Sequence, residues 1–201
     1  VDLIWLHCDL FPYMPGFFER LLSFTKKPII CDLDDAIFHN YNLNSKWYVR
    51  KILSRKLYDT ISLADITFCG NQYILKYAKK ISSRIEIVPT VVDTNILTPN
   101  DINKSNDNLI KIGWIGSPTT SRQYLFPMIP ILENLVTKEG GQINVMGANK
   151  KEIYKYQSVK FFEWSEESEL SFLQSLDIGI MPLTSTPWAR GKCGYKLIQY
   201  M

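Results

Sequence analysis

Short apolar runs alternate with stretches of helical periodicity in the first half of the chain. Residues 1–6 and 28–31 have the length of buried strands, and the segment between them carries Phe17, Phe18, Leu21 and Leu22 at helical spacing. The same pattern predicts a helix at 47–62, a strand at 64–69, a helix at 72–80 and a strand at 85–88. Strands that alternate with helices are typical of a parallel α/β sheet.

A polar, turn-forming run at residues 97–108 interrupts this pattern. After it, strands are predicted at 110–115, 143–146, 159–162 and 178–181, and helices at 123–138 and 166–176. We therefore predict two Rossmann-like domains, residues 1–96 and 110–201, joined by a linker at 97–109. Clefts between such domains are favoured ligand sites.

Composition narrows the class of protein. The chain has 201 residues, 46% of them hydrophobic, which is enough to bury a core. Its 23 basic and 20 acidic residues form no long basic stripe, so no nucleic-acid partner is expected. Four cysteines without CxxC spacing and two histidines predict neither a zinc site nor a disulfide framework, and favour the cytoplasm. No apolar run approaches the ~20 residues that span a bilayer, so we expect a soluble protein, and a fragment of a longer one.

The last 17 residues, STPWARGKCGYKLIQYM, place a glycine loop and two lysines at the start of a helix. Backbone amides and the positive end of a helix dipole form an anion site, and Lys192 and Lys196 add charge suited to a diphosphate. The alternative is a surface turn at Gly191 and Gly194 with solvated lysines. The apolar run at 177–183 favours the phosphate site, because ligands bind at the carboxyl ends of parallel strands.

Three carboxylates follow the second predicted strand, in IICDLDDAIF at 29–38. This motif resembles that of haloacid-dehalogenase-type phosphatases, which implies Asp32 as nucleophile and Asp34 as acid and base. Ala36 replaces the usual hydroxyl residue, however, and no later lysine and paired-aspartate motifs follow. A purely structural alternative has one aspartate capping the next helix and the others solvated.

The second half opens with a further candidate phosphate site. In IKIGWIGSPTTSR at 110–122, a strand runs into Gly116 and small polar residues, and Arg122 adds a fork of donors. The segment has neither the GxGxxG spacing of dinucleotide binders nor the GK[ST] of a P-loop.

Together with VPTVVD at 88–93, these stretches resemble, in order and spacing, the bacterial retaining glycosyltransferases of the GT-B class (group 1, family 4-like) over nearly the whole chain. The resemblance implies two Rossmann-like domains facing a cleft, both incomplete here. It also implies transfer of a sugar from a nucleotide-sugar donor to a polysaccharide or lipid-linked acceptor, in cell-surface polysaccharide biosynthesis, in the cytoplasm or at the cytoplasmic face of the membrane. Contact with the membrane is expected from segments outside this sequence.

The resemblance also implies roles for individual residues. On the acceptor side, Asp34 and Asp35 stand where relatives carry a histidine and aspartate pair that faces the cleft. The implied donor-binding residues are Gly116, Arg122, Lys192, Cys193, Gly194, Tyr195, Lys196 and Gln199. No metal or cofactor is expected, because lysines, arginine and helix dipoles neutralise the leaving diphosphate.

The chain departs from the family at two positions. Many relatives carry two glutamates eight residues apart where this chain has Gly191 and Gln199. Gln199 can still hydrogen-bond a ribose hydroxyl, whereas Gly191 offers no side chain to the sugar. A non-catalytic sugar-nucleotide-binding or assembly module is therefore the alternative function, and the phosphatase is the third.

Overall fold

The computed structural model describes residues 1–99 and 109–201. The chain forms two compact units, one of Val1–Thr90 with Ser185–Cys193 and the other of Val91–Thr184 with Gly194–Met201. Most of the predicted linker, residues 100–108, lies outside the described residues. The segment Ser185–Cys193 belongs to the first unit, although the sequence pattern assigned it to the second domain.

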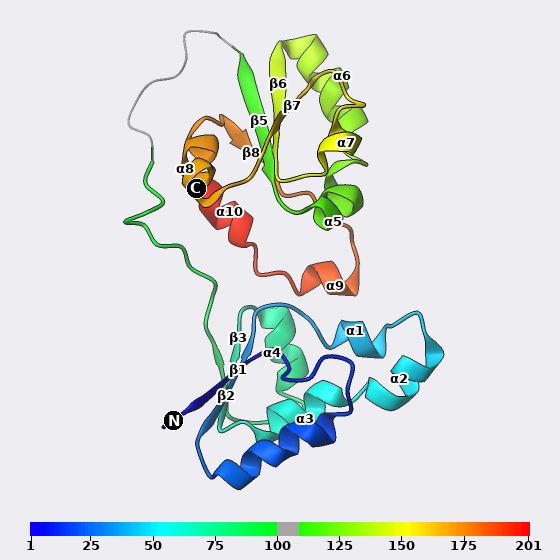
Figure 1. Cartoon of the computed structure of the whole chain (residues 1–201), viewed down its shortest axis with the longest axis vertical. Helices are drawn as coiled ribbons and strands as arrows, with labels where there is room; N and C mark the ends of the chain where they lie inside the picture. Colours follow the sequence, from blue (N-terminus) through cyan, green and yellow to red (C-terminus); the bar gives the residue numbers. More distant parts are fainter. Residues whose placement is uncertain (100–108) are drawn as a thin grey trace. The chain divides into compact units, whose positions relative to one another are not determined.

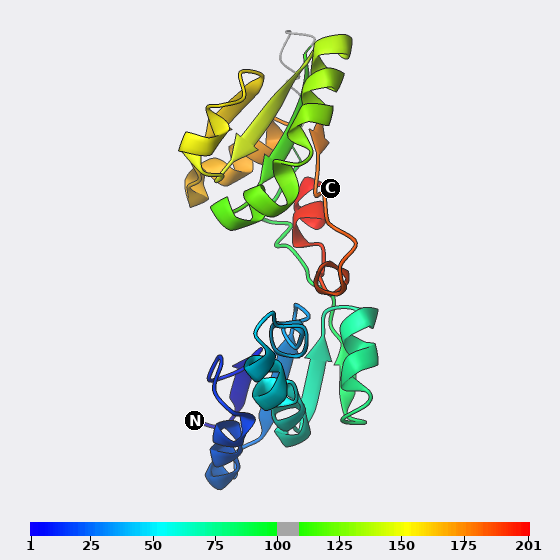
Figure 2. The ribbon, with the colours of Figure 1, turned by 90° about the vertical axis from the view of Figure 1, so that its right-hand side faces the viewer.

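The first unit is built on a parallel sheet in the order β1-β2-β3-β4, formed by β1 (Ile4–His7), β2 (Ile29–Leu33), β3 (Ile66–Cys69) and β4 (Ile85–Ile87). A 3₁₀ helix, η1 (Gly16–Thr25), connects β1 to β2, and α4 (Gln72–Ala78) connects β3 to β4. Between β2 and β3 lie α1 (His39–Asn42), α2 (Trp47–Leu53) and α3 (Lys56–Leu63). Helix α4 covers one face of the sheet, and η1 and α3 cover the other (Figure 2). The predicted parallel α/β arrangement is confirmed.

The helix predicted at 47–62 is two helices. Ser54 ends α2, and Arg55 precedes α3 with φ −103° and ψ 9°, outside helical geometry. The residues that α2 buries are Val49 and Leu53. Helix α3 buries Lys56, Leu57, Thr60 and Ile61. The break lets α3 begin with Lys56 directed into the protein.

The second unit has a parallel sheet in the order β7-β6-β5-β8, formed by β5 (Ile110–Ile115), β6 (Gly141–Met146), β7 (Val159–Phe162) and β8 (Ile178–Gly179). Helices α6 (Ile129–Glu139) and α7 (Lys150–Ile153) lie on one side of the sheet, and α8 (Glu166–Gln174) and α10 (Tyr195–Tyr200) lie on the other (Figure 1). Each side has its own buried cluster, one around Trp114, Leu125 and Ile143 and one around Ile115, Met146 and Phe172.

Several predicted boundaries in this unit are wrong, since β6 starts two residues earlier and α8 ends two residues earlier than predicted. The helix expected at 123–138 starts earlier, with α5 (Pro118–Thr120) and a π-helical turn, η2 (Ser121–Leu125). The reason is that the Ser117 side chain accepts a hydrogen bond from the Thr120 amide and caps α5. Pro127 lacks an amide proton and interrupts the helix, which restarts as α6 with Pro130 in its first turn. Strand β8 ends at Gly179, two residues before the predicted end. Among the described residues, no helix is long and apolar enough to cross a bilayer.

Candidate functional site

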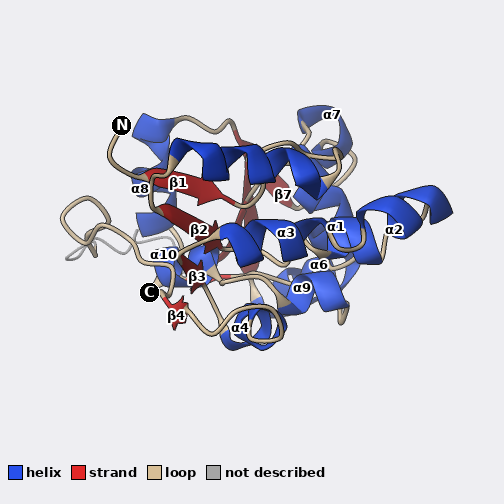
Figure 3. Cartoon of the chain, turned by 90° about the horizontal axis from the view of Figure 1, so that it is seen from below, coloured by secondary structure: helices blue, strands red, loops and turns tan. Residues whose placement is uncertain are grey.

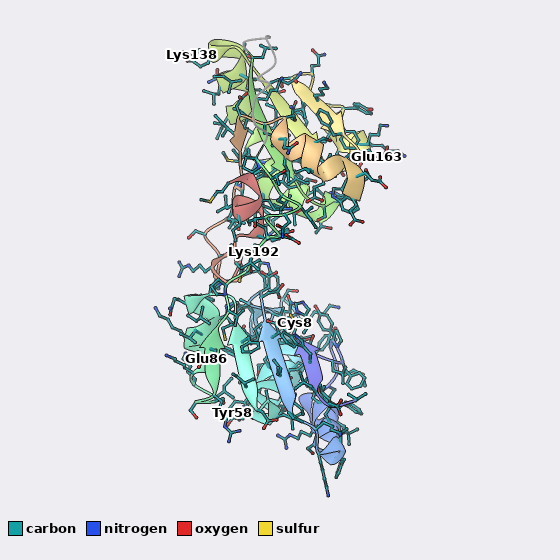
Figure 4. The ribbon with its side chains drawn as sticks, turned by 90° about the vertical axis from the view of Figure 1, so that its left-hand side faces the viewer. Cys8, Tyr58, Glu86, Lys138, Glu163 and Lys192 are labelled. Atoms are coloured by element: carbon teal, nitrogen blue, oxygen red, sulfur yellow. The ribbon has the colours of Figure 1, made fainter. Side chains whose placement is uncertain are left out.

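The carboxyl ends of β1 and β2 bring a histidine, a cysteine and two aspartates together. Neighbouring parallel strands end at the same edge of a sheet, so His7 at the end of β1 and Cys8 just after it meet Asp32 and Asp34 from β2 and the loop that follows it. The His7 ring lies 3.9 Å from Asp32 and 3.7 Å from Asp34, and the Cys8 thiol donates to Asp34 at 3.5 Å. Figure 4 shows Cys8 at this end of the strands.

The side chains of His7, Cys8 and Asp34 are close enough to hold a metal ion, with their ligand atoms all within 4.8 Å of one another. Burial and the nearby Asp34 carboxylate raise the pKa of the Cys8 thiol far above its usual range. The thiol therefore keeps its proton and uses it in the hydrogen bond to Asp34, and a metal ion would have to displace that proton. The sequence had predicted no metal site here.

Asp35 is paired with Lys192 from the segment Ser185–Cys193, which packs in the first unit. The Lys192 ammonium lies 3.2 Å from an Asp35 carboxylate oxygen (Figure 4 labels Lys192). The Cys193 thiol donates to the backbone carbonyl of Asp34 at 2.7 Å. Burial raises the pKa of the Asp35 carboxyl, and Lys192 offsets part of that rise. Two predicted donor residues, Lys192 and Cys193, thus contact the two predicted acceptor-side aspartates.

Asn71 directly precedes the helix predicted at 72–80, and its place in this site was not predicted. Its side-chain oxygen accepts from the amides of Tyr73 and Ile74 and caps α4. Its side-chain amide nitrogen donates to the backbone carbonyl of Gly191 at 2.9 Å. One Asn71 side chain therefore fixes both the start of α4 and the segment that ends at Cys193. The capping signature marks Asn71 in the sequence, but nothing local indicates the second bond.

Gly191 lies directly against the backbone of Ala36. A Cβ atom at position 191 would collide with the Cβ of Ala36 and lie 2.8 Å from its amide nitrogen, closer than real Cβ atoms come. No side chain fits at this position in the observed conformation. The position at which the family resemblance would place a glutamate is therefore occupied by the one residue that permits this approach.

In the second unit, Gly116 and Lys196 lie together at the carboxyl end of β5. The Lys196 ammonium lies 4.6 Å from the centre of the Trp114 ring. A Cβ at Gly116 would collide with that same ammonium and with the edge of the Trp114 ring. The absence of a side chain at Gly116 therefore leaves its backbone next to the lysine charge, in the part of the sheet where the resemblance places the phosphates.

Arg122 lies on η2 and forms a forked pair with Glu152 of α7. Its Nε lies 2.9 Å from both carboxylate oxygens of Glu152, and a terminal nitrogen lies 2.8 Å from one of them. This pair raises the pKa of Arg122 and lowers that of Glu152, with hydrogen bonding as the first cause for both. Arg122 would have to leave Glu152, at least in part, to contact a phosphate.

The remaining predicted donor residues lie at and along α10. Gly194 has φ +74° and starts the helix, and Tyr195 is half exposed. Gln199 donates to one carboxylate oxygen of Glu169 on α8 at 2.6 Å, and the Trp164 indole donates to the other at 2.6 Å. Trp164 is 54% exposed, so it lies at the surface and not in the core. No sequence pattern indicated Glu169, because its partner Gln199 lies 30 positions away.

Comparisons by sequence find no match to this chain, either among family models or among curated proteins. Comparison of folds finds a structure described as trehalose-6-phosphate from E. coli bound with UDP-2-fluoro glucose, at 11% identity and TM-score 0.61 over 100% of this chain and 56% of that one. An OtsA apo structure matches at 13% identity and TM-score 0.58 over 90% and 52%. An S. aureus TarM mutant in complex with Fondaparinux, alpha-GlcNAc-glycerol and UDP matches at 12% identity and TM-score 0.52 over 87% and 36%.

These similarities concern the fold. The chain spans between about a third and just over half of the length of the three structures. Its two parallel four-stranded sheets, each with helices on both sides, correspond to the Rossmann-like domains of these GT-B glycosyltransferases. The chain therefore has the GT-B fold and spans part of the length of these structures.

Proposed function

We propose that the protein containing this chain is a glycosyltransferase that moves a sugar from a nucleotide-sugar donor to a polysaccharide or lipid-linked acceptor. One observation carries the proposal, the pairing of Gly116 with Lys196 at the end of β5. In the sheet order β7-β6-β5-β8, the chain leaves β5 toward β6 and later returns to the other side of β5 as β8. Ligands of open parallel sheets bind at the carboxyl ends of the strands, at such a switch point.

The donor diphosphate is proposed to bind against the Gly116 backbone and the Lys196 ammonium. A glycine lets the phosphate approach the main chain, and a lysine supplies a compact positive charge. The nucleoside is proposed to lie toward Gln199 and Glu169, whose carboxylate suits hydroxyl donors. Two of the similar structures are described with UDP or UDP-2-fluoro glucose, which supports a nucleoside diphosphate donor.

The acceptor is proposed to meet the carboxylates at the carboxyl end of β2. Asp34 accepts from Cys8 and lies near His7, and Asp35 has a carboxyl pKa raised by burial. A carboxylate with a raised pKa is a better base for an acceptor hydroxyl than an ordinary aspartate. Asp35→Asn should therefore slow sugar transfer. Asp34→Asn should also slow it and leave donor binding unchanged, because Asp34 is proposed to orient the acceptor.

The test is calorimetric titration of the full-length protein with UDP and other nucleoside diphosphates. A charge-assisted contact to phosphate contributes ~1.5 to 3 kcal/mol, so Lys196→Met should weaken binding by roughly 10- to 100-fold at ~1.4 kcal/mol per decade. Lys160→Met is the matched control, since Lys160 also lies over an aromatic ring, Phe162, but on β7. Equal affinity of a folded Lys196→Met variant and the parent protein would remove Lys196 from the site.

Gly191 supports a second candidate, a non-catalytic sugar-nucleotide-binding module, because its contact with Ala36 leaves no room for a residue that touches the donor sugar. Donor binding without transfer or release of the sugar to any acceptor would favour this module. The phosphatase alternative requires Mg²⁺-dependent phosphate release that is lost in Asp32→Asn. Sugar transfer that survives a chelator would exclude it.

A further inference from the structure

Helix α2 exposes a face that combines aromatic, aliphatic and basic side chains. Val49 and Leu53 face the core, whereas Trp47, Tyr48, Lys51 and Ile52 are exposed. Trp47 and Lys51 are four residues apart, as are Tyr48 and Ile52, so the four side chains form one continuous surface, which we call the α2 face. Trp47 is 65% exposed and Ile52 is 66% exposed, although both are large apolar side chains.

The charge around the α2 face has one sign. Residues 38–58 include five basic residues and no acidic residue. One of the five, Lys56, is buried against Glu19, and the other four, Lys46, Arg50, Lys51 and Arg55, are exposed. Across residues 1–99 and 109–201, no salt bridge involves these four. Lys46 and Lys51 instead lie over the rings of Tyr48 and Trp47, each 6.0 Å from the ring centre.

Helix α2 lies at the periphery of the first unit, farther from β1–β4 than α3 does (Figures 1 and 3). The Arg50 guanidinium closes the turn before the helix by donating to the carbonyls of Asn44 and Ser45. The α2 face is thus held on a folded helix whose inner side is anchored by Val49 and Leu53. A flat surface can reach it without rearrangement of the core.

We propose that the α2 face docks the protein on an anionic lipid bilayer. Tryptophan and tyrosine side chains prefer the boundary between headgroups and acyl chains, and neighbouring lysines and arginines are attracted to anionic headgroups. A nucleic acid would satisfy the basic residues but would leave Ile52 and the Trp47 ring without an apolar environment. An anionic lipid surface offers negative headgroups to the basic residues and an apolar layer to Trp47 and Ile52. The proposal does not depend on the sugar-transfer reaction.

Co-sedimentation of the full-length protein with vesicles tests it. Binding is expected to vesicles of phosphatidylcholine with phosphatidylglycerol, and much less to phosphatidylcholine alone. The double variant Lys46→Glu/Lys51→Glu should bind the mixed vesicles roughly tenfold or more weakly, and Trp47→Ser/Ile52→Ser should lose a similar factor. All four side chains are exposed, and circular dichroism of each variant verifies that it is folded.

The control variants make the same types of substitution on α6, away from the α2 face. Ile131→Ser alters an isoleucine that is 62% exposed on α6, and Lys138→Glu reverses an exposed charge on the same helix. Both should bind mixed vesicles like the parent protein. The proposal is overturned if the parent ignores mixed vesicles, or if the controls lose as much binding as the α2 variants. It is also overturned if duplex DNA competes fully while Trp47→Ser/Ile52→Ser has no effect, since that result identifies a nucleic-acid surface.

Discussion

The buried ion pair between Glu19 and Lys56 yields a quantitative prediction. Glu19 comes from η1 and Lys56 begins α3, and their exposed fractions are 0% and 2%. The Lys56 ammonium lies 2.5 Å from a Glu19 carboxylate oxygen and 3.9 Å from Asp9. Asp9 follows Cys8 in the loop after β1, so the pair also fixes the loop that carries part of the candidate acceptor site.

Replacement of Glu19 by leucine leaves the Lys56 charge buried with only the more distant Asp9. Breaking a buried pair by removing one partner costs ~3 to 5 kcal/mol of the free energy of unfolding. Because Asp9 remains near Lys56, we expect a loss of ~3 kcal/mol, at the lower end of this range. For a unit of this size that corresponds to a fall in midpoint temperature of roughly 12 to 24 °C. The neighbouring Arg20→Leu is the control. Arg20 pairs with Asp59 at 2.5 Å but is largely exposed, so its loss should cost less than ~1 kcal/mol.

Because the chain has two units, the measurement must report on the first unit alone. Native-state hydrogen exchange of the β2 amides supplies its free energy of opening. The double variant Glu19→Leu/Lys56→Met removes both charges and should recover most of the loss, since replacing a whole buried pair by apolar residues is often neutral. Equal protection in Glu19→Leu and Arg20→Leu would refute the reasoning, as would a double variant less stable than Glu19→Leu.

Three further predictions concern the candidate site. Gly191→Glu restores a side chain that has no room, so limited proteolysis should cut within Ser185–Cys193 sooner than in the parent protein; unchanged cleavage would contradict this. Burial raises the pKa of Asp35 and Lys192 lowers it, so the acid limb of a pH–rate profile that depends on Asp35 should lie above the ordinary ~3.9 and move further up in Lys192→Met. The sign follows because loss of a nearby cation favours the neutral carboxyl, and a downward shift would contradict it. Glu169→Ala should weaken UMP and UDP binding alike, by about tenfold, whereas Lys196→Met should weaken mainly UDP in the same titration.

The sequence predicted the parallel α/β architecture because the signals for its strands and helices are local. Short apolar runs and helical spacing depend on neighbouring residues, and they located most strands to within two residues. Predicted helix boundaries were wrong where the backbone interrupts a helix. This happens at Pro127 in the second unit and at the break before Lys56 in the first. The first interruption depends on the amide proton that proline lacks. The second is associated with the buried pairing of Lys56 with Glu19, which lies 37 positions away in the sequence.

The candidate site was predicted less well, because its contacts join distant parts of the chain. The bond from Asn71 to Gly191 spans 120 positions, and that from Lys192 to Asp35 spans 157. Periodicity carries no information at such separations. The predicted residue types suit phosphate and acceptor chemistry, and their roles stay a prediction. Which lysine meets which carboxylate follows only from the packing of Ser185–Cys193 in the first unit.

Lys192 and Lys196 were expected to serve one diphosphate, but the chain passes from one unit to the other between Cys193 and Gly194. Lys192 pairs with Asp35, whereas Lys196 lies beside Gly116 and Trp114. To bind phosphate, Lys192 must first give up a charge-assisted contact of ~1.5 to 3 kcal/mol, about as much as it would gain. Its net contribution to donor affinity should therefore be near zero, and its main effect should be on the protonation of Asp35. Titration of Lys192→Met with UDP tests this inference, which fails if that variant loses as much affinity as Lys196→Met.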